Sequence, residues 1–201
     1  MLIALGLGPG DSDLITIRGT RLLKDADKVF VPGEIARKIV GPYADATVLD
    51  FPMTNDEDAV REAMERNCDV IAPVALKGTA VLGILGDPCF YSTFERLCRV
   101  MRERYPELKF RSEPGISSIT AFASRLPVAV DSGLLVTDGS EHGCMLQLKV
   151  RRPLETVKQL RSRGYNEFYL VERMYMDGEK VYREKEMPDV CDYMSVMFAR
   201  R

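Results

Sequence analysis

The first half of the chain alternates short apolar runs with stretches of helical periodicity, and this alternation limits the folds open to it. Residues 2–7, 28–31 and 80–85 are largely apolar, and each run stops at glycine or proline. Residues 90–104 instead space their apolar side chains as on one face of a helix. Strands and helices in alternation indicate a parallel α/β sheet. We therefore expect an α/β domain over residues 1–111.

The pattern changes after residues 112–115, which read as a junction. One helix is expected at residues 116–126 and another from Pro153 to about Arg163. The pair Asp177-Gly178 predicts a hairpin. We expect a second, mixed α+β domain over residues 115–201, because ~100–200 residues per domain allow two small domains in this length. Its predicted strands are 134–137, 144–150, 167–171, 180–183 and 193–198.

Charge and cysteine content exclude several kinds of partner. Lys and Arg total 28 against 30 for Asp and Glu, so the net charge of −2 gives no reason to expect nucleic acid or an anionic membrane surface. No apolar run approaches the ~18 residues that span a bilayer, and the N-terminus lacks the basic start of a signal peptide. The five cysteines are odd in number and form no CxxC pair, which fits a reduced compartment. We expect a cytoplasmic protein without a membrane or nucleic-acid partner.

The chain has a single histidine, His142, and this narrows the chemistry. A metal site with several histidines is impossible, and a triad based on histidine has one candidate base. No metal is expected. Catalysis must then depend on backbone groups, carboxylates, hydroxyls or a reactive cofactor.

A glycine-rich turn, GLGPGD at residues 6–11, follows the opening strand. It nearly matches the dinucleotide fingerprint GxGxxG, but Asp11 stands where the third glycine belongs and Pro9 lacks an N–H for phosphate. The hypothesis of a dinucleotide-binding protein therefore rests on an imperfect motif. The plain alternative is a tight turn from strand to helix.

Two further motifs follow predicted strands. GDPCFYST at residues 86–93 ends the most apolar strand, and PGISSITA at residues 114–121 opens a helix with small hydroxyl residues. Open α/β sheets bind ligands beyond the carboxyl ends of their strands, and N–H groups point outward at a helix N-terminus. Simple helix capping by Asp87 and Ser117 is the structural alternative for both motifs.

Taken in order, the three motifs resemble those of the tetrapyrrole (corrin and porphyrin) methylases. Their pattern is GxGPGDxxLLT, GDPxxY and PGxSS or PGxTA, and here stand GLGPGDSDLIT (6–16), GDPCFY (86–91) and PGISS (114–118). Further similarity lies in LQLKV (146–150), YLVERM (169–174) and YMSVMFARR (193–201). The resemblance implies a two-domain fold that holds S-adenosylmethionine in a cleft between the domains, with S-adenosylhomocysteine as the product.

The subfamily is narrowed by GDPCFYSTF and by LDFPM at residues 49–53. Both resemble the methyltransferases that act on carbon 20 of precorrin-2 or cobalt-factor II in cobalamin biosynthesis. Two alternatives stay open: methylation of another tetrapyrrole carbon, and a module that binds S-adenosylmethionine without turnover. The resemblance also implies a homodimer.

The family's site residues carry over position by position. No pattern in the sequence points to a dedicated catalytic residue, and Asp87 and Tyr91 are the best polar candidates near the transfer site. Cations are expected to hold the substrate's carboxylates, with Arg18, Arg37, Lys38 and Arg125 as candidates. The implied cofactor-binding residues are Pro9, Gly86, Asp87, Phe90, Ser117, Ser118, Leu148 and Met174.

The chain departs from the family pattern at residues 140–143. These four residues alone separate LLVTDG (134–139) from CMLQLKV (144–150), where family members carry a longer insertion with a helix. We therefore expect a shortened second domain.

Overall fold

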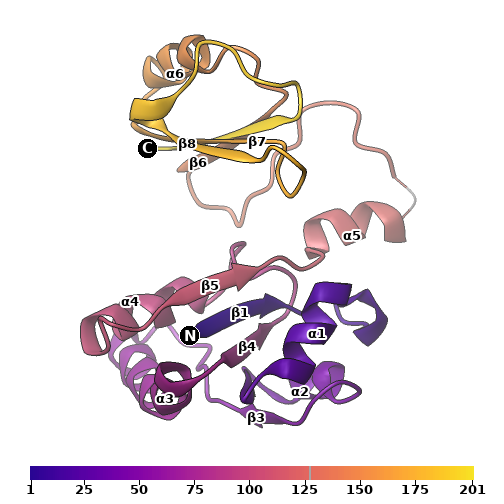
Figure 1. Cartoon of the computed structure of the whole chain (residues 1–201), viewed down its shortest axis with the longest axis vertical. Coiled ribbons are helices and arrows are strands. Elements are labelled where there is room, and N and C mark those ends of the chain that lie inside the picture. Colours follow the sequence, from indigo (N-terminus) through magenta and orange to yellow (C-terminus); the bar gives the residue numbers. More distant parts are fainter. Residues whose placement is uncertain (127) are drawn as a thin grey trace. The chain divides into compact units, whose positions relative to one another are not determined.

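The computed structural model describes residues 1–126 and 128–201 (Figure 1). Contacts within the chain divide it into two compact units, Met1–Leu134 and Leu135–Arg201. Each unit has its own sheet and its own buried core. The domains expected from the sequence, 1–111 and 115–201, stay a proposal. None of the described helices is both long and apolar enough to cross a membrane.

The first unit contains a five-stranded sheet in the order β3-β2-β4-β1-β5, with every pair parallel. Two of its three inner strands, β1 and β4, are buried at every residue, as a parallel sheet covered on both faces requires. The strands are β1 Leu2–Gly6, β2 Lys28–Val31, β3 Ala46–Val48, β4 Ala80–Ile84 and β5 Phe110–Glu113.

Helices cover both faces of this sheet because successive strand residues point to opposite sides. Leu2 and Leu82 pack into one cluster with residues of α3 and α4, whereas Ile3 and Val81 pack into a second cluster with residues of α1 and α2 (Figure 1). The bounds are η1 Ser12–Leu14, α1 Ile17–Asp25, α2 Glu34–Val40, α3 Glu57–Lys77, α4 Phe94–Arg104 and α5 Ser118–Arg125.

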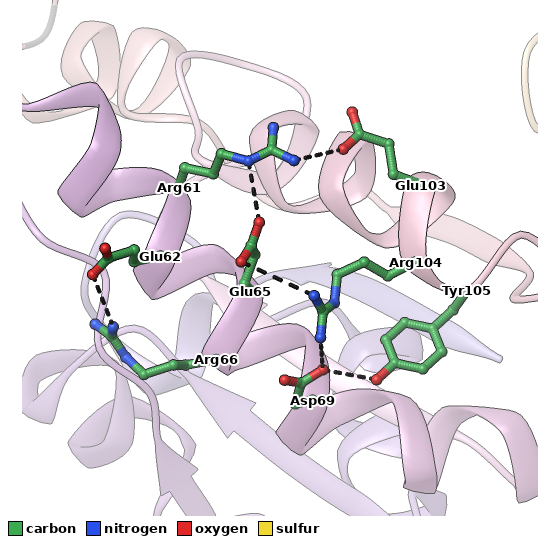
Figure 2. A network of polar contacts seen from close by, with 8 residues as sticks. All are labelled: Arg61, Glu62, Glu65, Arg66, Asp69, Glu103, Arg104 and Tyr105. Carbon is green, nitrogen blue, oxygen red and sulfur yellow. Dashed lines mark hydrogen bonds and ion pairs between the residues drawn. The ribbon is translucent and has the colours of Figure 1, made fainter.

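Helices α3 and α4 are also joined on their solvent side by a network of charged groups (Figure 2). Arg61 bridges Glu65 of its own helix and Glu103 of α4, at 3.1 and 3.0 Å. Asp69 Oδ1 accepts hydrogen bonds from Arg104 at 2.7 Å and from the Tyr105 hydroxyl at 2.8 Å. The network therefore ties two helices that are distant in sequence.

Strand β5 corrects the expectation of a junction at residues 112–115. Residues 110–113 pair with β1 in parallel and form the edge of the sheet. Three of the four side chains of β5 are only partly buried or exposed. Its sequence, FRSE, therefore needs no apolar run and has none. An edge strand of this kind has no hydrophobic pattern that would reveal it.

The second unit is a four-stranded antiparallel sheet in the order β6-β9-β7-β8. Helix α6 packs Val157 and Leu160 against Phe168, Leu170 and Met197 of the sheet. The expected fold class, a parallel α/β part followed by a mixed α+β part, is confirmed. The elements are β6 Cys144–Leu148, α6 Pro153–Arg161, β7 Glu167–Glu172, β8 Lys180–Arg183, η2 Glu184–Glu186 and β9 Ser195–Arg200.

The strand predicted at residues 134–137 is wrong. This stretch is irregular and exposed, and β6, the next strand along the chain, pairs with β9 alone. Leu134 and Leu135 keep 60% and 64% of their surface in solvent. An apolar run becomes a strand only where a neighbouring strand accepts its hydrogen bonds, and none pairs with residues 134–137 in the described structure.

Candidate functional site

Two of the three sequence motifs are joined by backbone hydrogen bonds. The N–H of Gly86 donates to the carbonyl oxygen of Gly8 at 2.8 Å, and the N–H of Gly8 donates to that of Gly86 at 3.3 Å. The loop after β1 is thereby tied to the loop after the neighbouring strand β4. Both loops lie at the carboxyl edge of the sheet, where open α/β sheets bind ligands.

The third motif meets the other two by direct contact of main-chain atoms. A Cβ atom on Gly6 would lie 2.6 Å from the carbonyl oxygen of Gly86, and one on Gly115 would lie 2.6 Å from Cα of Gly6. Such distances leave no room for any side chain, so glycine is required at Gly6 and Gly115. The sequence placed the three motifs on separate loops, and the structure brings them together at one edge.

Asp87 connects the second motif to the third. Its Oδ1 accepts the N–H of Cys89 at 2.8 Å, and its Oδ2 accepts the N–H of Gly115 at 3.1 Å. Both carboxylate oxygens are thus bound to backbone donors. The candidate catalytic residue Asp87 therefore holds two loops in place, and the sequence alone does not reveal its bond to Gly115.

The third motif opens helix α5 as expected. Ser117 is the N-cap, and its Oγ accepts the N–H of Ile119 at 3.3 Å. Ser118 is the first helical residue and is exposed. The hydroxyl residues named from the sequence therefore lie at a helix N-terminus, the position that favours partial negative charge in a ligand.

The side of the motifs that faces solvent is open and partly aromatic. Gly86 has φ +68°, and the nearest atom to a Cβ placed on it is Ser117 Cα at 4.0 Å. Pro9 is exposed beside it, and Phe90 and Tyr91 expose 46% and 65% of their surface. Open space at Gly86 and exposed rings in the same motif are compatible with a ligand that has apolar and aromatic parts.

Tyr91, the other catalytic candidate, has a left-handed backbone with φ +50°. A non-glycine residue in this region is uncommon, and such residues gather at functional sites. The left-handed conformation of Tyr91 is therefore a second reason to consider this loop as part of a functional site.

The two remaining cofactor candidates lie in the second unit. Leu148 ends β6 and Met174 follows β7, with 64% and 42% of their surface exposed. Left-handed residues adjoin both of them: Lys149 after Leu148, and Arg173 and Tyr175 on either side of Met174. Leu148 and Met174 therefore each lie next to a residue with a left-handed backbone conformation.

Two of the four cations expected to bind substrate already have acidic partners. Arg18 lies 3.3 Å from Glu113, and Arg37 lies 2.7 Å from Glu34. Glu113 is only 7% exposed and also pairs with Arg111 at 3.0 Å. The sequence analysis missed this buried carboxylate because it lies in the unrecognised strand β5. Across residues 1–126 and 128–201, no group of three or more His, Cys, Asp or Glu side chains could hold a metal ion.

Residues 1–187 match the protein family described as Tetrapyrrole (Corrin/Porphyrin) Methylases. The chain belongs to this family. This tetrapyrrole methylase carries all three of the family's motifs, and the resemblance expected from them is confirmed. The family assignment makes the chain a methyltransferase.

Two curated relatives of this methylase are named as cobalt-precorrin-2 methyltransferases. It is 27% identical to the "Probable cobalt-precorrin-2 C(20)-methyltransferase" of Methanocaldococcus jannaschii, over 98% of this chain and 94% of the relative. It is 30% identical to the cobalt-precorrin-2 C(20)-methyltransferase of Salmonella typhimurium, over 65% of this chain and 59% of the relative. The first alignment spans 221 positions, more than the 201 residues present here, so that relative has residues that this methylase lacks.

Solved structures show the same fold. The crystal structure of the methyltransferase CobJ superposes with a TM-score of 0.52 at 17% identity, and covers 100% of this methylase and 93% of that chain.

Proposed function

We propose that this methylase transfers a methyl group from S-adenosylmethionine to carbon 20 of precorrin-2 or cobalt-factor II. The observation that carries the proposal is the meeting of the three family motifs at one edge of the sheet, through Gly6, Gly86 and Gly115. The two relatives named for carbon-20 methylation support the choice of ring position.

The residues at this edge fit the cofactor. The open backbone at Gly86 gives a surface on which a ligand can lie close to main-chain atoms, and Phe90 offers an exposed ring for packing. Asp87 fixes the loop geometry. We assign the cofactor to Pro9, Gly86, Asp87, Phe90, Ser117 and Ser118 of the first unit and Leu148 and Met174 of the second.

When bound, S-adenosylmethionine supplies a methyl group that its sulfonium already activates. The residues of the chain then have to position the acceptor carbon and exclude water. Asp87 uses both oxygens on backbone N–H groups, so its part is to hold the loops. A reaction in which the cofactor supplies the activation and the protein supplies the positioning does not require several histidines, and this chain has one.

The test is incubation of the protein with S-adenosylmethionine and cobalt-precorrin-2 or precorrin-2, followed by mass spectrometry and NMR. We expect a mass gain of one methyl group, with the new carbon at position 20. A methyl group at another ring carbon would change the assigned position and keep the reaction class.

A second candidate is a module that binds S-adenosylmethionine without turnover. The observation that favours it is the short connection at residues 140–143, together with the residues that the Methanocaldococcus jannaschii relative has and this methylase lacks. Calorimetry distinguishes the two, because a module of this kind binds S-adenosylmethionine but methylates none of the tetrapyrroles offered.

We also propose a cytoplasmic homodimer. Several large apolar side chains are exposed, among them Phe122, Leu134 and Leu135, and these are compatible with self-association. Sedimentation of the purified protein tests it, and a monomer at all concentrations would contradict the dimer.

A further inference from the structure

Two cations of the second unit converge on one tyrosine ring just after β6. The Nζ atom of Lys149 lies 5.5 Å from the centroid of the Tyr193 ring, and Cζ of Arg151 lies 5.3 Å from the same centroid. A cation over an aromatic face is attracted by the ring's quadrupole. We call Lys149, Arg151 and Tyr193 the cationic cluster.

Backbone hydrogen bonds fix the two segments that carry the cluster. The N–H of Lys149 donates to the carbonyl oxygen of Ser195 at 2.9 Å, and the N–H of Cys191 donates to that of Arg151 at 3.1 Å. Residues 149–151 and 191–195 therefore run side by side. The cluster is thus built on a hydrogen-bonded framework rather than on a free loop.

The positive charge of the cluster is balanced only in part, because Arg151 attracts Asp192 from a distance and helps to lower the pKa of that carboxyl. Within the described parts of the chain, Lys149 and Arg151 form no ion pair, whereas Arg152 next to them pairs with Glu155 at 2.8 Å. The nearby Asp192 is engaged by Arg173 and by the N–H of Met194. Two like charges on one ring repel each other, and a bound anion would relieve that repulsion.

The hydrogen-bonding pattern leaves donors for such an anion. The nearby Tyr193 hydroxyl raises the pKa of Lys149, so the lysine is charged at neutral pH. The hydroxyl of Tyr193 also has its own proton to donate. Lysine, arginine and tyrosine together offer the charge-assisted donors that carboxylates prefer.

The backbone of Lys149 is a further reason to look for a role of its side chain. Its φ is +58°, in the left-handed region that glycine adopts readily and lysine adopts only with strain. Strain of this kind persists where the surrounding structure or the function requires the side chain.

We propose that the cationic cluster binds a carboxylate side chain of the tetrapyrrole substrate. Corrin precursors carry many carboxylates, and two of the cations first expected to meet them, Arg18 and Arg37, are paired with glutamates. The inference rests on the proposed function for the identity of its substrate. Lys149 and Arg151 supply the charge, and the Tyr193 hydroxyl donates a hydrogen bond.

The test compares three variants of the whole chain, K149M, R151M and Y193F, with R152M as the matched control. R152M removes a neighbouring surface arginine that does not touch the Tyr193 ring. Affinity for a porphyrin octacarboxylate is measured by fluorescence titration, affinity for S-adenosylmethionine by calorimetry, and folding by the melting temperature. KM and kcat for cobalt-precorrin-2 are measured where turnover is present.

We expect K149M and R151M each to weaken porphyrin binding about tenfold or more, the scale of a lost charged hydrogen bond. Y193F should weaken it less, and R152M less than about twofold. Affinity for S-adenosylmethionine should stay unchanged in all four, and the loss should fall on KM rather than kcat. Inorganic phosphate at millimolar concentration should compete only weakly with the porphyrin.

Binding by K149M and R151M as tight as by R152M would overturn the proposal, as would complete displacement of the porphyrin by phosphate, which would indicate a general anion site. Failure of the proposed function has a different signature. The wild type would then bind the porphyrin through the cluster without methylating cobalt-precorrin-2.

Discussion

Asp87 shows how one side chain can connect two of the sequence motifs. Its carboxylate holds the N–H groups of Cys89 and Gly115, which belong to different loops. Removal of this carboxylate would leave both donors without their partner and release the third motif from the second. The residue thus links the geometry of the edge to its expected affinity for the cofactor.

We predict that Asp87→Ala weakens binding of S-adenosylmethionine by ~1–3 kcal/mol, the cost of losing charged hydrogen bonds. Calorimetry on the folded variant measures this. Asp138→Ala is the matched control, because Asp138 also accepts two hydrogen bonds, both from Ser140, but lies outside the motifs. Equal affinity in the two variants would refute the role of Asp87.

Gly115 is a second residue whose replacement has a defined effect. An added Cβ would press on main-chain atoms of Gly6 and Gly86, which cannot move aside as a flexible side chain would. We expect Gly115→Ala to lower the free energy of unfolding by about 1–3 kcal/mol, as overpacked sites do. Denaturant unfolding measures it. Gly133→Ala, where a Cβ meets open space, should be nearly neutral, and an equal loss in both would contradict the contact.

At the residue scale the sequence predicted which residues lie at the edge of the sheet better than it predicted which groups they contact. The motifs named Gly86, Asp87 and Ser117, and all three lie at one edge of the sheet. The bond from Gly115 to Asp87 could not be foreseen, since it joins loops 28 residues apart. The cationic cluster was also missed, because its tyrosine and its two cations come from distant segments.

Among the elements, α3 and α4 are joined by their charged network (Figure 2). Glu65 and Asp69 each have two partners in it, and those of Asp69 are Arg104 and Tyr105. Hydrogen bonds from Arg104, and to a lesser extent from Tyr105, hold the pKa of Asp69 below its usual range. The bond between Tyr105 and Asp69 also raises the pKa of Tyr105. A lowered pKa in the folded state means that the ionised carboxylate contributes stability at neutral pH.

We predict that Asp69→Asn lowers the melting temperature near neutral pH and that the difference disappears in acid. The contribution is fully present above the ordinary aspartate pKa and is lost as the pH falls through the lowered pKa of the folded state. Melting curves of both proteins across the acid range measure it. The exposed Asp45→Asn serves as control, and a difference that persists at the lowest pH would argue against this cause.

The elements divide into those with an internal pattern and those without one. Strands β1 and β4 are apolar throughout and were predicted nearly to the residue. Strand β5 has a mixed sequence and was missed, while the apolar residues 134–137 were taken for a strand and are irregular. In both cases the outcome depends on whether a partner strand is present, which a local pattern does not contain.

Across the whole molecule, four of the five cysteines are either fully buried or fully accessible to a reagent. Cys68 and Cys98 are buried in the first core, and burial raises the pKa of each to about 12. Their thiols are therefore protonated and inert in the folded protein. Cys89 and Cys144 are exposed, and Cys89 lies in the second motif.

We expect a thiol reagent to label Cys89 and Cys144 rapidly in the native protein, and Cys68 and Cys98 only after unfolding. Saturating S-adenosylmethionine should slow labelling at Cys89, because the proposed site includes its neighbours Asp87 and Phe90. Mass spectrometry of digested protein measures each site. Labelling of Cys68 in the native state would contradict the burial, and unchanged labelling of Cys89 would count against the cofactor site.

The edge formed by Gly6, Gly86 and Gly115 consists of main-chain atoms, and this has a consequence for how such a protein could be redesigned. A platform made from backbone keeps its shape when exposed side chains around it are exchanged. Acceptor preference could therefore be altered by substitutions on the surrounding loops while the proposed platform for the methyl donor is left intact. A library that spares the three glycines and Asp87 is the place to begin.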